Sequence, residues 1–262
     1  VQAIAAYNSF LAVAPRAPQR EEAMRRIGDL EMDSADIRSE DAQATGGPDY
    51  RAATARYRDV LKTFPNSPGN DRVLYQLARA QEQGGDLEAA LKTLDRLVKD
   101  YPATALVEEA QFRRGELLFT ARNYASAEKA YATVLQRGAA SRYHDRALYM
   151  QGWSQFKQGK LDEAVQSFFG VLDLKLAGRA DGGALETLDG LSRADRELVE
   201  DTFRVTSLSL TNLKGAESIA PYIQSPERQA YAFRVYEQLG ELYLKQERVK
   251  DAADTFALFA RT

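Results

Sequence analysis

Residues 71–104 read DRVLYQLARAQEQGGDLEAALKTLDRLVKDYPAT and contain two apolar stripes separated by a pair of glycines. In each stripe apolar residues recur at spacings of three and four, which is typical of one face of an α-helix. Gly84 and Gly85 end the first helix, Asp86 can cap the second, and Pro102 follows its end. This stretch therefore predicts a helix, a tight turn and a second helix.

The same pattern recurs along the chain. With Asp71 as position 1, small residues recur at positions 8 and 20, and bulky residues at positions 4, 7, 24 and 27. Small residues let the two helices of a unit approach closely, while bulky residues fill the space beside them. The position-8 residues Ala78, Gly115 and Gly152 are spaced 37 residues apart. Because one helix pair cannot bury both of its faces, we expect the units to stack into an array.

About seven units fit this pattern, with about 13 helices in a single array over residues 1–262. They are 1–15 (the second helix of a truncated unit), 21–68 (with an insertion at about 32–47), 71–104, 108–141, 145–178, 179–224 (divergent, with an insertion) and 226–262 (lacking its end). In the divergent unit we expect a helix capped by Ser192 and a short helix over 216–223; Ser225 and Pro226 begin the next helix. The uncovered first helix predicts a fragment of a longer array.

This pattern resembles the tetratricopeptide repeat (TPR) family. The 37-residue period and the joints Phe64-Pro-Asn-Ser-Pro68 and Tyr101-Pro-Ala-Thr104 resemble the repeats of bacterial cell-envelope TPR proteins, of the Tol-Pal coordinator and outer-membrane assembly lipoprotein types. The resemblance covers residues 1–175 and 226–262. It implies an all-α fold, an α-solenoid of antiparallel helix pairs wound into a right-handed superhelix. It also implies a protein–protein interaction scaffold in the periplasm or cell envelope, with a cytoplasmic location as the alternative.

In such families the concave face is lined by the first helix of each unit (helix A), at positions 2, 5, 9, 12 and 13. In the three regular units these positions supply the candidate partner-binding residues Arg72, Tyr75, Arg79, Phe112, Glu116, Phe119, Arg146, Tyr149, Trp153 and Phe156. Aromatic anchors surrounded by arginine tend to dominate interfaces. We expect this groove to take an extended or helical peptide. The alternative is that positions 5 and 12 simply pack against the neighbouring unit.

The clamp by which some family members hold a C-terminal carboxylate is not supported. It needs lysine and asparagine at positions 5 and 9 of one unit, where this chain has Arg25 and Asp29 or Tyr75 and Arg79.

Composition excludes several other classes of protein. A net charge of −3 without a basic stripe argues against a nucleic-acid partner, and the absence of cysteine excludes disulfides and thiolate chemistry. No apolar run approaches the roughly 20 residues of a membrane span, so direct membrane insertion is not expected.

No constellation of catalytic or metal-binding residues is evident. The single histidine, His144, lies between Ser141 and Asp145 at the start of a predicted helix, with Ser141 as its cap, so we assign it to packing or surface use. We therefore expect no cofactor, no metal site and no enzymatic activity.

An acidic cluster has only Arg38 as counter-charge and lacks the pattern of a calcium loop, so we interpret it as a solvated insertion. Its members are Asp29, Glu31, Asp33, Asp36, Glu40 and Asp41.

Two functions from different classes remain open. The first is a non-enzymatic scaffold that binds a partner peptide or protein through the concave helix A face, within a bacterial envelope complex. The second is a structural, self-associating superhelical spacer in a larger envelope assembly or secretion apparatus. The two differ in whether the chain associates with itself.

Overall fold

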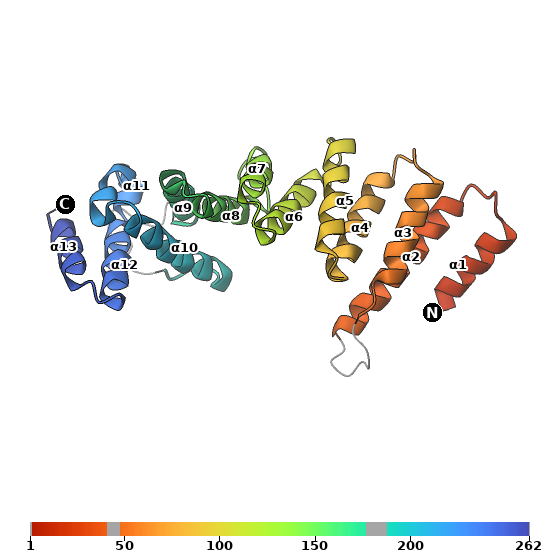
Figure 1. Cartoon of the computed structure of the whole chain (residues 1–262), viewed down its shortest axis with the longest axis horizontal. Coiled ribbons are helices and arrows are strands. Elements are labelled where there is room, and N and C mark those ends of the chain that lie inside the picture. Colours follow the sequence, from red (N-terminus) through yellow and green to blue (C-terminus); the bar gives the residue numbers. More distant parts are fainter. Residues whose placement is uncertain (1, 41–47, 177–187, 262) are drawn as a thin grey trace. The chain divides into compact units, whose positions relative to one another are not determined.

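A computed structural model describes residues 2–40, 48–176 and 188–261 (Figure 1). Within these residues all regular structure is helical, which confirms the all-α prediction. The chain forms two compact units, Val1–Leu117 (unit 1) and Leu118–Thr262 (unit 2). Each of them contains several of the repeat units of the sequence pattern, which are single helix pairs. Among the described residues, no helix combines the length and the apolar character needed to cross a bilayer.

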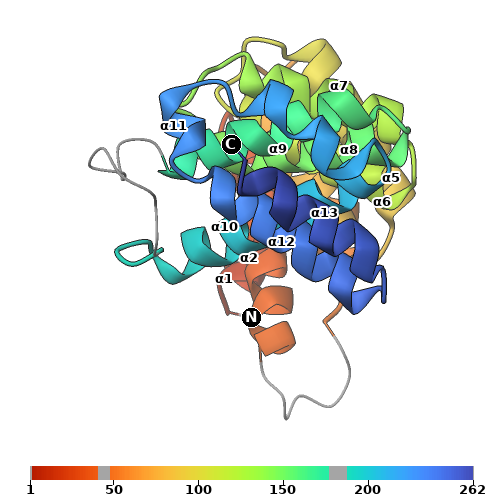
Figure 2. The same cartoon turned by 90° about the vertical axis from the view of Figure 1, so that its left-hand side faces the viewer.

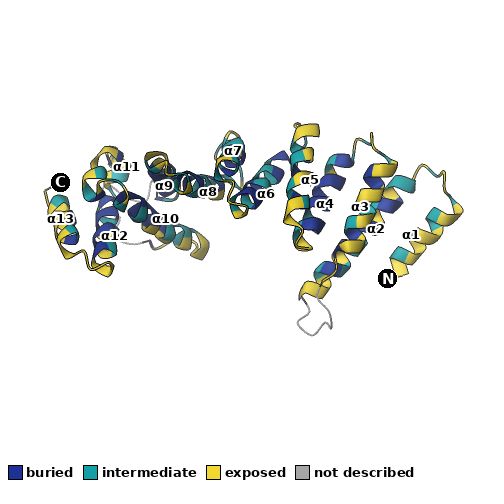
Figure 3. Ribbon diagram, viewed as in Figure 1, coloured by how far each residue is buried: buried dark blue, intermediate teal, exposed yellow. Residues whose placement is uncertain are grey.

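Unit 1 consists of helices that follow one another in antiparallel pairs (Figure 1). They are α1 (Gln2–Val13), α2 (Arg20–Glu40), α3 (Arg51–Thr63), α4 (Asn70–Gln83), α5 (Leu87–Asp100) and most of α6 (Val107–Thr120). The buried residues lie where neighbouring helices face each other (Figure 3). The largest fully buried side chains in the continuous core of unit 1 are Tyr57, Leu74, Leu94 and Leu97.

The tight turns inside the helix pairs share one backbone conformation. Gly85, Arg122, Gly159 and Glu247 have φ angles of +82°, +59°, +75° and +60°, and all occupy position 15 of their units. Only glycine adopts this left-handed conformation without a steric cost. The turn geometry is therefore kept even where the sequence does not supply glycine.

The joints between repeat units also share a hydrogen-bond pattern. Thr104 Oγ1 donates to Asp71 Oδ2 (2.5 Å) and accepts from the backbone N–H of Leu106 (3.2 Å). Ser67, 37 residues earlier, donates in the same way to Glu21, and its hydroxyl accepts from the backbone N–H of the second residue after it. Each joint hydroxyl thus connects the end of a unit to the start of that unit's helix A.

The expected insertion at about 32–47 is, as far as residue 40, a continuation of helix A. Helix α2 runs unbroken to Glu40, and Met32 and Ala35 are buried against the core. The prediction of a solvated acidic insertion was therefore wrong for Met32 and Ala35, whereas Asp33 and residues 37–39 are exposed. Residues 41–47, which include Asp41, lie outside the described residues.

Two carboxylates of the acidic cluster are held by neighbouring helices. The hydroxyl of Tyr57 donates to Asp29 (2.9 Å), and the hydroxyl of Tyr50 donates to Asp36 (2.9 Å). The counter-charges are Arg25, four residues earlier on α2, which donates to Asp29 (3.0 Å), and Arg79 on α4, whose guanidinium lies 3.9 Å from the carboxylate of Asp36. The acidic residues of α2 therefore join helices to one another.

Unit 2 begins with the end of α6 and one further helix, continues with a regular helix pair, and ends with another pair after an irregular segment (Figure 2). Its elements are α7 (Tyr124–Leu135), α8 (His144–Lys157), α9 (Leu161–Leu176), α10 (Arg193–Thr211), the 3-10 helices η1 (Gly215–Ser218) and η2 (Ala220–Tyr222), α11 (Pro226–Gln229), α12 (Ala232–Lys245) and α13 (Val249–Phe259). Helix α10 lies between α9 and α12. The expected boundary near residue 178 falls outside the described residues.

The irregular segment differs from the sequence prediction in two places. The short helix expected over 216–223 is two 3-10 turns. Ser225 caps a helix as predicted, its hydroxyl accepting from the N–H of Arg228 (3.3 Å), but that helix ends at Gln229 and α12 begins anew at Ala232. Arg228 and Tyr231 both bind Asp173 of α9, and this anchoring holds the chain where the helix is interrupted.

Candidate functional site

The ten candidate partner-binding residues lie on helices α4, α6 and α8, and they are divided between the two compact units. Unit 1 holds Arg72, Tyr75, Arg79, Phe112 and Glu116, and unit 2 holds Phe119, Arg146, Tyr149, Trp153 and Phe156.

In unit 1, Tyr75 is buried within a polar network between α4 and α6. Its hydroxyl donates to Glu109 Oε1 (2.5 Å) and accepts from Arg113 Nε (3.1 Å). Arg113 also donates to Glu82 Oε2 (3.2 Å). Burial and the bond to the Glu109 carboxylate raise the pKa of Tyr75 to about 12. Phe112 is also buried, so the position of both rings is explained by packing.

Arg79 lies on the neighbouring turn of α4 and is half-buried. It donates to the side-chain oxygen of Gln76 (3.3 Å) and faces the carboxylate of Asp36 on α2. Its charge is therefore partly balanced inside unit 1.

Arg72 and Tyr75 border a hollow of about 220 Å³ in unit 1. Its other lining residues are Arg25, Asp29, Val73, Gln76 and Leu106. Most of the surface that these residues expose to the hollow belongs to apolar atoms. Arg25 and Asp29 occupy positions 5 and 9 of the preceding unit, so the helix A rule would have found them had it been applied there. Leu106 precedes α6 at the joint, and nothing in the sequence pattern marks it.

In unit 2, the side chains of Tyr149, Trp153 and Phe156 form an aromatic strip along α8. The ring centroid of Trp153 lies 6.5 Å from that of Tyr149 and 5.6 Å from that of Phe156, in edge-to-face arrangements. All three rings are half-buried, over a small core that contains Phe168 and Val205. Packing and partial exposure are therefore combined in this strip, as is common for residues that anchor partners.

The strip has polar groups at both ends. The hydroxyl of Tyr149 donates to Asp201 on α10, and burial together with this bond raises the pKa of Tyr149 to about 12. The ammonium group of Lys157 lies 5.7 Å from the ring centroid of Trp153. The exposed part of the strip thus joins aromatic surface to a positive charge.

Two candidates of unit 2 are not members of this strip: Phe119 at the end of α6, and Arg146, which precedes Tyr149 by three residues on α8. Phe119 is half-buried, with its ring centroid 5.2 Å from that of Tyr124. Arg146 is exposed near the start of α8.

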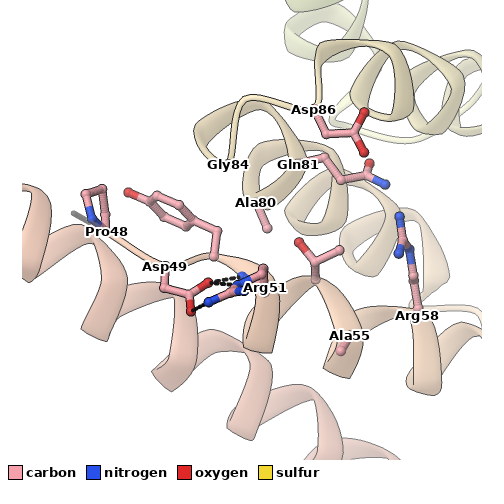
Figure 4. A pocket seen from close by; sticks show the side chains of 11 residues that line it. Pro48, Asp49, Arg51, Ala55, Arg58, Ala80, Gln81, Gly84 and Asp86 are labelled. Atoms are coloured by element: carbon pink, nitrogen blue, oxygen red, sulfur yellow. Dashed lines mark hydrogen bonds and ion pairs between the residues drawn. The ribbon is translucent and has the colours of Figure 1, made fainter. Parts of the chain in front are cut away.

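A larger cavity of about 570 Å³ lies beside α3, where the sequence pattern did not predict a site (Figure 4). Its lining comes from α3 and the residues just before it, from the end of α4, and from the turn between α4 and α5: Pro48, Asp49, Tyr50, Arg51, Thr54, Ala55, Arg58, Ala80, Gln81, Gly84 and Asp86. Asp49 accepts two hydrogen bonds from the Arg51 guanidinium, and Asp86 caps α5. The carboxylates of Asp49 and Asp86 are thus occupied by local contacts, and the described lining contains no histidine or cysteine.

His144 is the first residue of α8, in the predicted first turn. The hydroxyl of Ser141 accepts from the N–H of Tyr143 (3.0 Å), so it caps the preceding turn and not the helix itself. The imidazole Nδ1 lies 3.7 Å from Asp145. Within the described ranges, no group of three or more His, Cys, Asp or Glu side chains is placed to hold a metal ion.

Comparison with known proteins places the chain among repeat proteins. Two family models described as tetratricopeptide repeat match residues 48–111 and 109–174. No curated protein matches the sequence.

Solved structures show the same fold at low sequence identity. A tetratricopeptide repeat protein from Parabacteroides merdae is 16% identical, with 97% of this chain and 83% of that chain covered and a TM-score of 0.54. The MamA protein is 15% identical, with 88% and 96% covered and a TM-score of 0.54. A structure from Podosopora anserina, composed of TPR-like repeats that are nearly identical to one another, is 14% identical to this chain. The match covers 86% of this chain and 98% of that chain, with a TM-score of 0.52.

Proposed function

This chain is a tetratricopeptide repeat protein with an α-solenoid fold, and we propose that it is a non-enzymatic scaffold that binds a partner peptide or protein through its helix A surfaces. Repeats of this family generally serve as protein-interaction modules. The proposal rests on one observation: helix A positions 2 and 5 of the 71–104 unit border an open hollow whose lining is mostly apolar. An unfilled apolar hollow on a solvated surface is a typical feature of a binding site.

The aromatic strip of unit 2 supports the same proposal. Trp153 and Phe156 keep part of their ring surface in contact with solvent although apolar neighbours are close at hand. Tryptophan and other aromatic residues are enriched among the residues that dominate binding energy. Each unit therefore offers its own surface for a partner.

Site-specific crosslinking tests this proposal. A photo-activatable phenylalanine analogue replaces Arg72 on α4 or Phe156 on α8. As controls on the second helix of a pair, it replaces the exposed Lys62 on α3 or Lys99 on α5. We expect the helix A positions to crosslink to a common second polypeptide in the cells that make the protein, and the controls not to. Equal crosslinking from both sets, or none to another polypeptide, would contradict the proposal.

A self-associating spacer is the alternative function. Light scattering over a range of concentrations distinguishes it from a partner-binding scaffold. A mass that stays at that of one chain excludes self-association, whereas a mass that rises with concentration favours the spacer.

We also propose a location in the periplasm or cell envelope of a bacterium. The support is the 37-residue period with its proline-containing joints, at Pro65 and Pro102. Cell fractionation tests it: release by osmotic shock agrees with the periplasm, and recovery with a cytosolic marker would instead place the protein in the cytoplasm.

A further inference from the structure

The hollow of unit 1 has the size of a single side chain. At about 220 Å³ it is smaller than the roughly 300–1,000 Å³ of pockets that hold whole small molecules. Val73 is buried beneath it, and Tyr75 and Leu106 contribute to its lining. Tyr75 is fixed by its bonds to α6, so this lining is largely preformed. Such a hollow suits one large aliphatic or aromatic side chain.

Two of the three charged residues that line the hollow already neutralise each other. Arg25 donates to Asp29 (3.0 Å) and to Glu22 (2.6 Å). The second oxygen of Asp29 accepts from the hydroxyl of Tyr57. Neither charge is available to a ligand without breaking a bond inside the unit.

Arg72 is the exception. Its side chain is exposed, and among the described residues it has no hydrogen bond or ion pair with another side chain. The adjacent carboxylate of Asp71 is bound by Thr104 at the joint. A positive charge therefore stands unpaired beside the apolar hollow, where it would complement a negative group on a partner.

Resting on the proposed function, we propose that the hollow holds a large aliphatic or aromatic side chain of the partner while Arg72 pairs with an aspartate or glutamate side chain within two residues of it. A single guanidinium suits a side-chain carboxylate of a segment that passes over the hollow. A terminal carboxylate would need several convergent donors, and Arg25 is already occupied. The partner is therefore an internal acidic–apolar peptide segment.

Selection from a random peptide library displayed on phage tests this. The displayed 12-residue peptides are fused at their C-termini, so any selected carboxylate belongs to a side chain. We expect the enriched sequences to carry Leu, Ile, Met or Phe with Asp or Glu within two residues. A synthetic, amidated version of the most enriched sequence then serves as the probe in fluorescence anisotropy.

Variants of the chain identify the residues that make the contact. Arg72→Glu should weaken binding of the probe by at least about fivefold, and changing the acidic residue of the peptide to lysine should restore it. Gln76→Phe should weaken binding by filling the hollow. Lys62→Glu, the same change of charge on exposed α3, serves as the control and should have no effect.

The outcomes separate this inference from the proposed function. Failure to enrich any sequence would contradict both. Enriched peptides without an acidic residue, or binding that is insensitive to Arg72→Glu while the variant's circular dichroism is unchanged, would overturn the inference alone. A further comparison uses the peptide with its internal acidic residue replaced, made once with a free C-terminal carboxylate and once amidated. Tighter binding of the free-acid form would assign Arg72 to a terminal carboxylate and would also overturn the inference.

Discussion

The ring of Phe168 lies directly against the backbone of Gly152: a Cβ atom added at Gly152 would be 2.6 Å from Cε1 of the ring. Real Cβ atoms are not found so close to another carbon, so α8 and α9 can approach this closely only with glycine at position 8. The same relationship recurs between Gly28 and Tyr57 (2.7 Å) and between Gly240 and Phe256 (2.3 Å). The 71–104 unit has Ala78 at this position, and there position 24 is the smaller Leu94. Positions 8 and 24 are therefore matched in size.

The first prediction concerns this pair. Gly152→Ala should destabilise the chain by about 1–3 kcal/mol, because the added methyl group forces the Phe168 ring or α9 to move. Chemical denaturation followed by circular dichroism measures the loss. Adding Phe168→Leu should recover part of it, since leucine is what the 71–104 unit pairs with alanine. If the double variant is no more stable than Gly152→Ala alone, the size match is not the cause.

The second prediction concerns the turns inside the helix pairs. Arg122 and Glu247 hold the left-handed conformation that glycine holds at Gly85 and Gly159. Arg122→Gly and Glu247→Gly should each stabilise the chain by up to about 1 kcal/mol, because the steric cost of the side chain is removed. Thermal unfolding measures the gain, and Gly85→Ala is the reverse control, which should destabilise. A loss of stability in both glycine variants would show that the turns are not strained.

The third prediction is a dependence on alkaline pH. The pKa values of Tyr75 and Tyr149 are raised to about 12 by burial and by their carboxylate partners. Each tyrosine holds its proton more tightly in the folded than in the unfolded chain. Its contribution to stability is therefore present below the unfolded pKa of about 10 and is lost as the pH rises toward 12. Comparing denaturation from pH 9 to pH 12, we expect Tyr75→Phe and Tyr149→Phe to lose stability less steeply than the parent chain. Parallel profiles would contradict this.

The fourth prediction concerns the anchor of the irregular segment. The Arg228 guanidinium donates to Asp173 through Nε (3.0 Å) and Nη2 (2.7 Å) and to the backbone oxygen of Tyr222 (2.8 Å), while Tyr231 also donates to Asp173 (2.7 Å). Arg228→Ala should cost about 2 kcal/mol, because a half-buried carboxylate loses its main partner. Urea denaturation measures this cost.

Arg228→Lys is the matched variant for that measurement. Lysine keeps the charge but cannot make the two-pronged contact, so it should recover only part of the loss. Full recovery would mean that charge alone holds the segment in place.

The regular units could be predicted from sequence because their signals are local. Apolar spacing of three and four, the glycine at Gly85 and the cap at Asp86 act within a few residues, and the helix α5 begins directly after that cap, whose side chain accepts from Ala89 (3.1 Å). The end of α2 could not be predicted in this way. Its acidic residues suggested a solvated insertion, and the groups that bind two of them, Tyr57 and Tyr50, come from another helix.

For the candidate site, too, the sequence predicted which residues share a surface but not which contacts they make. The helix A rule places Arg72 and Tyr75 on one surface, and both line the hollow. The rule does not distinguish exposed from buried rings, and Phe112 is buried although its position alone suggested a contact for a partner. Nor does it indicate that Arg25 is paired and Arg72 is not.

By itself, the sequence determined the helix pairs, their 37-residue period and the small and bulky positions that let the pairs stack, because each of these depends on residues a few positions apart. Only the tertiary structure decided how far α2 extends, where the helix before α12 is interrupted, and which charges remain unpaired. These depend on side chains such as Tyr57, Asp173 and Asp29, whose partners are brought close only when distant helices pack.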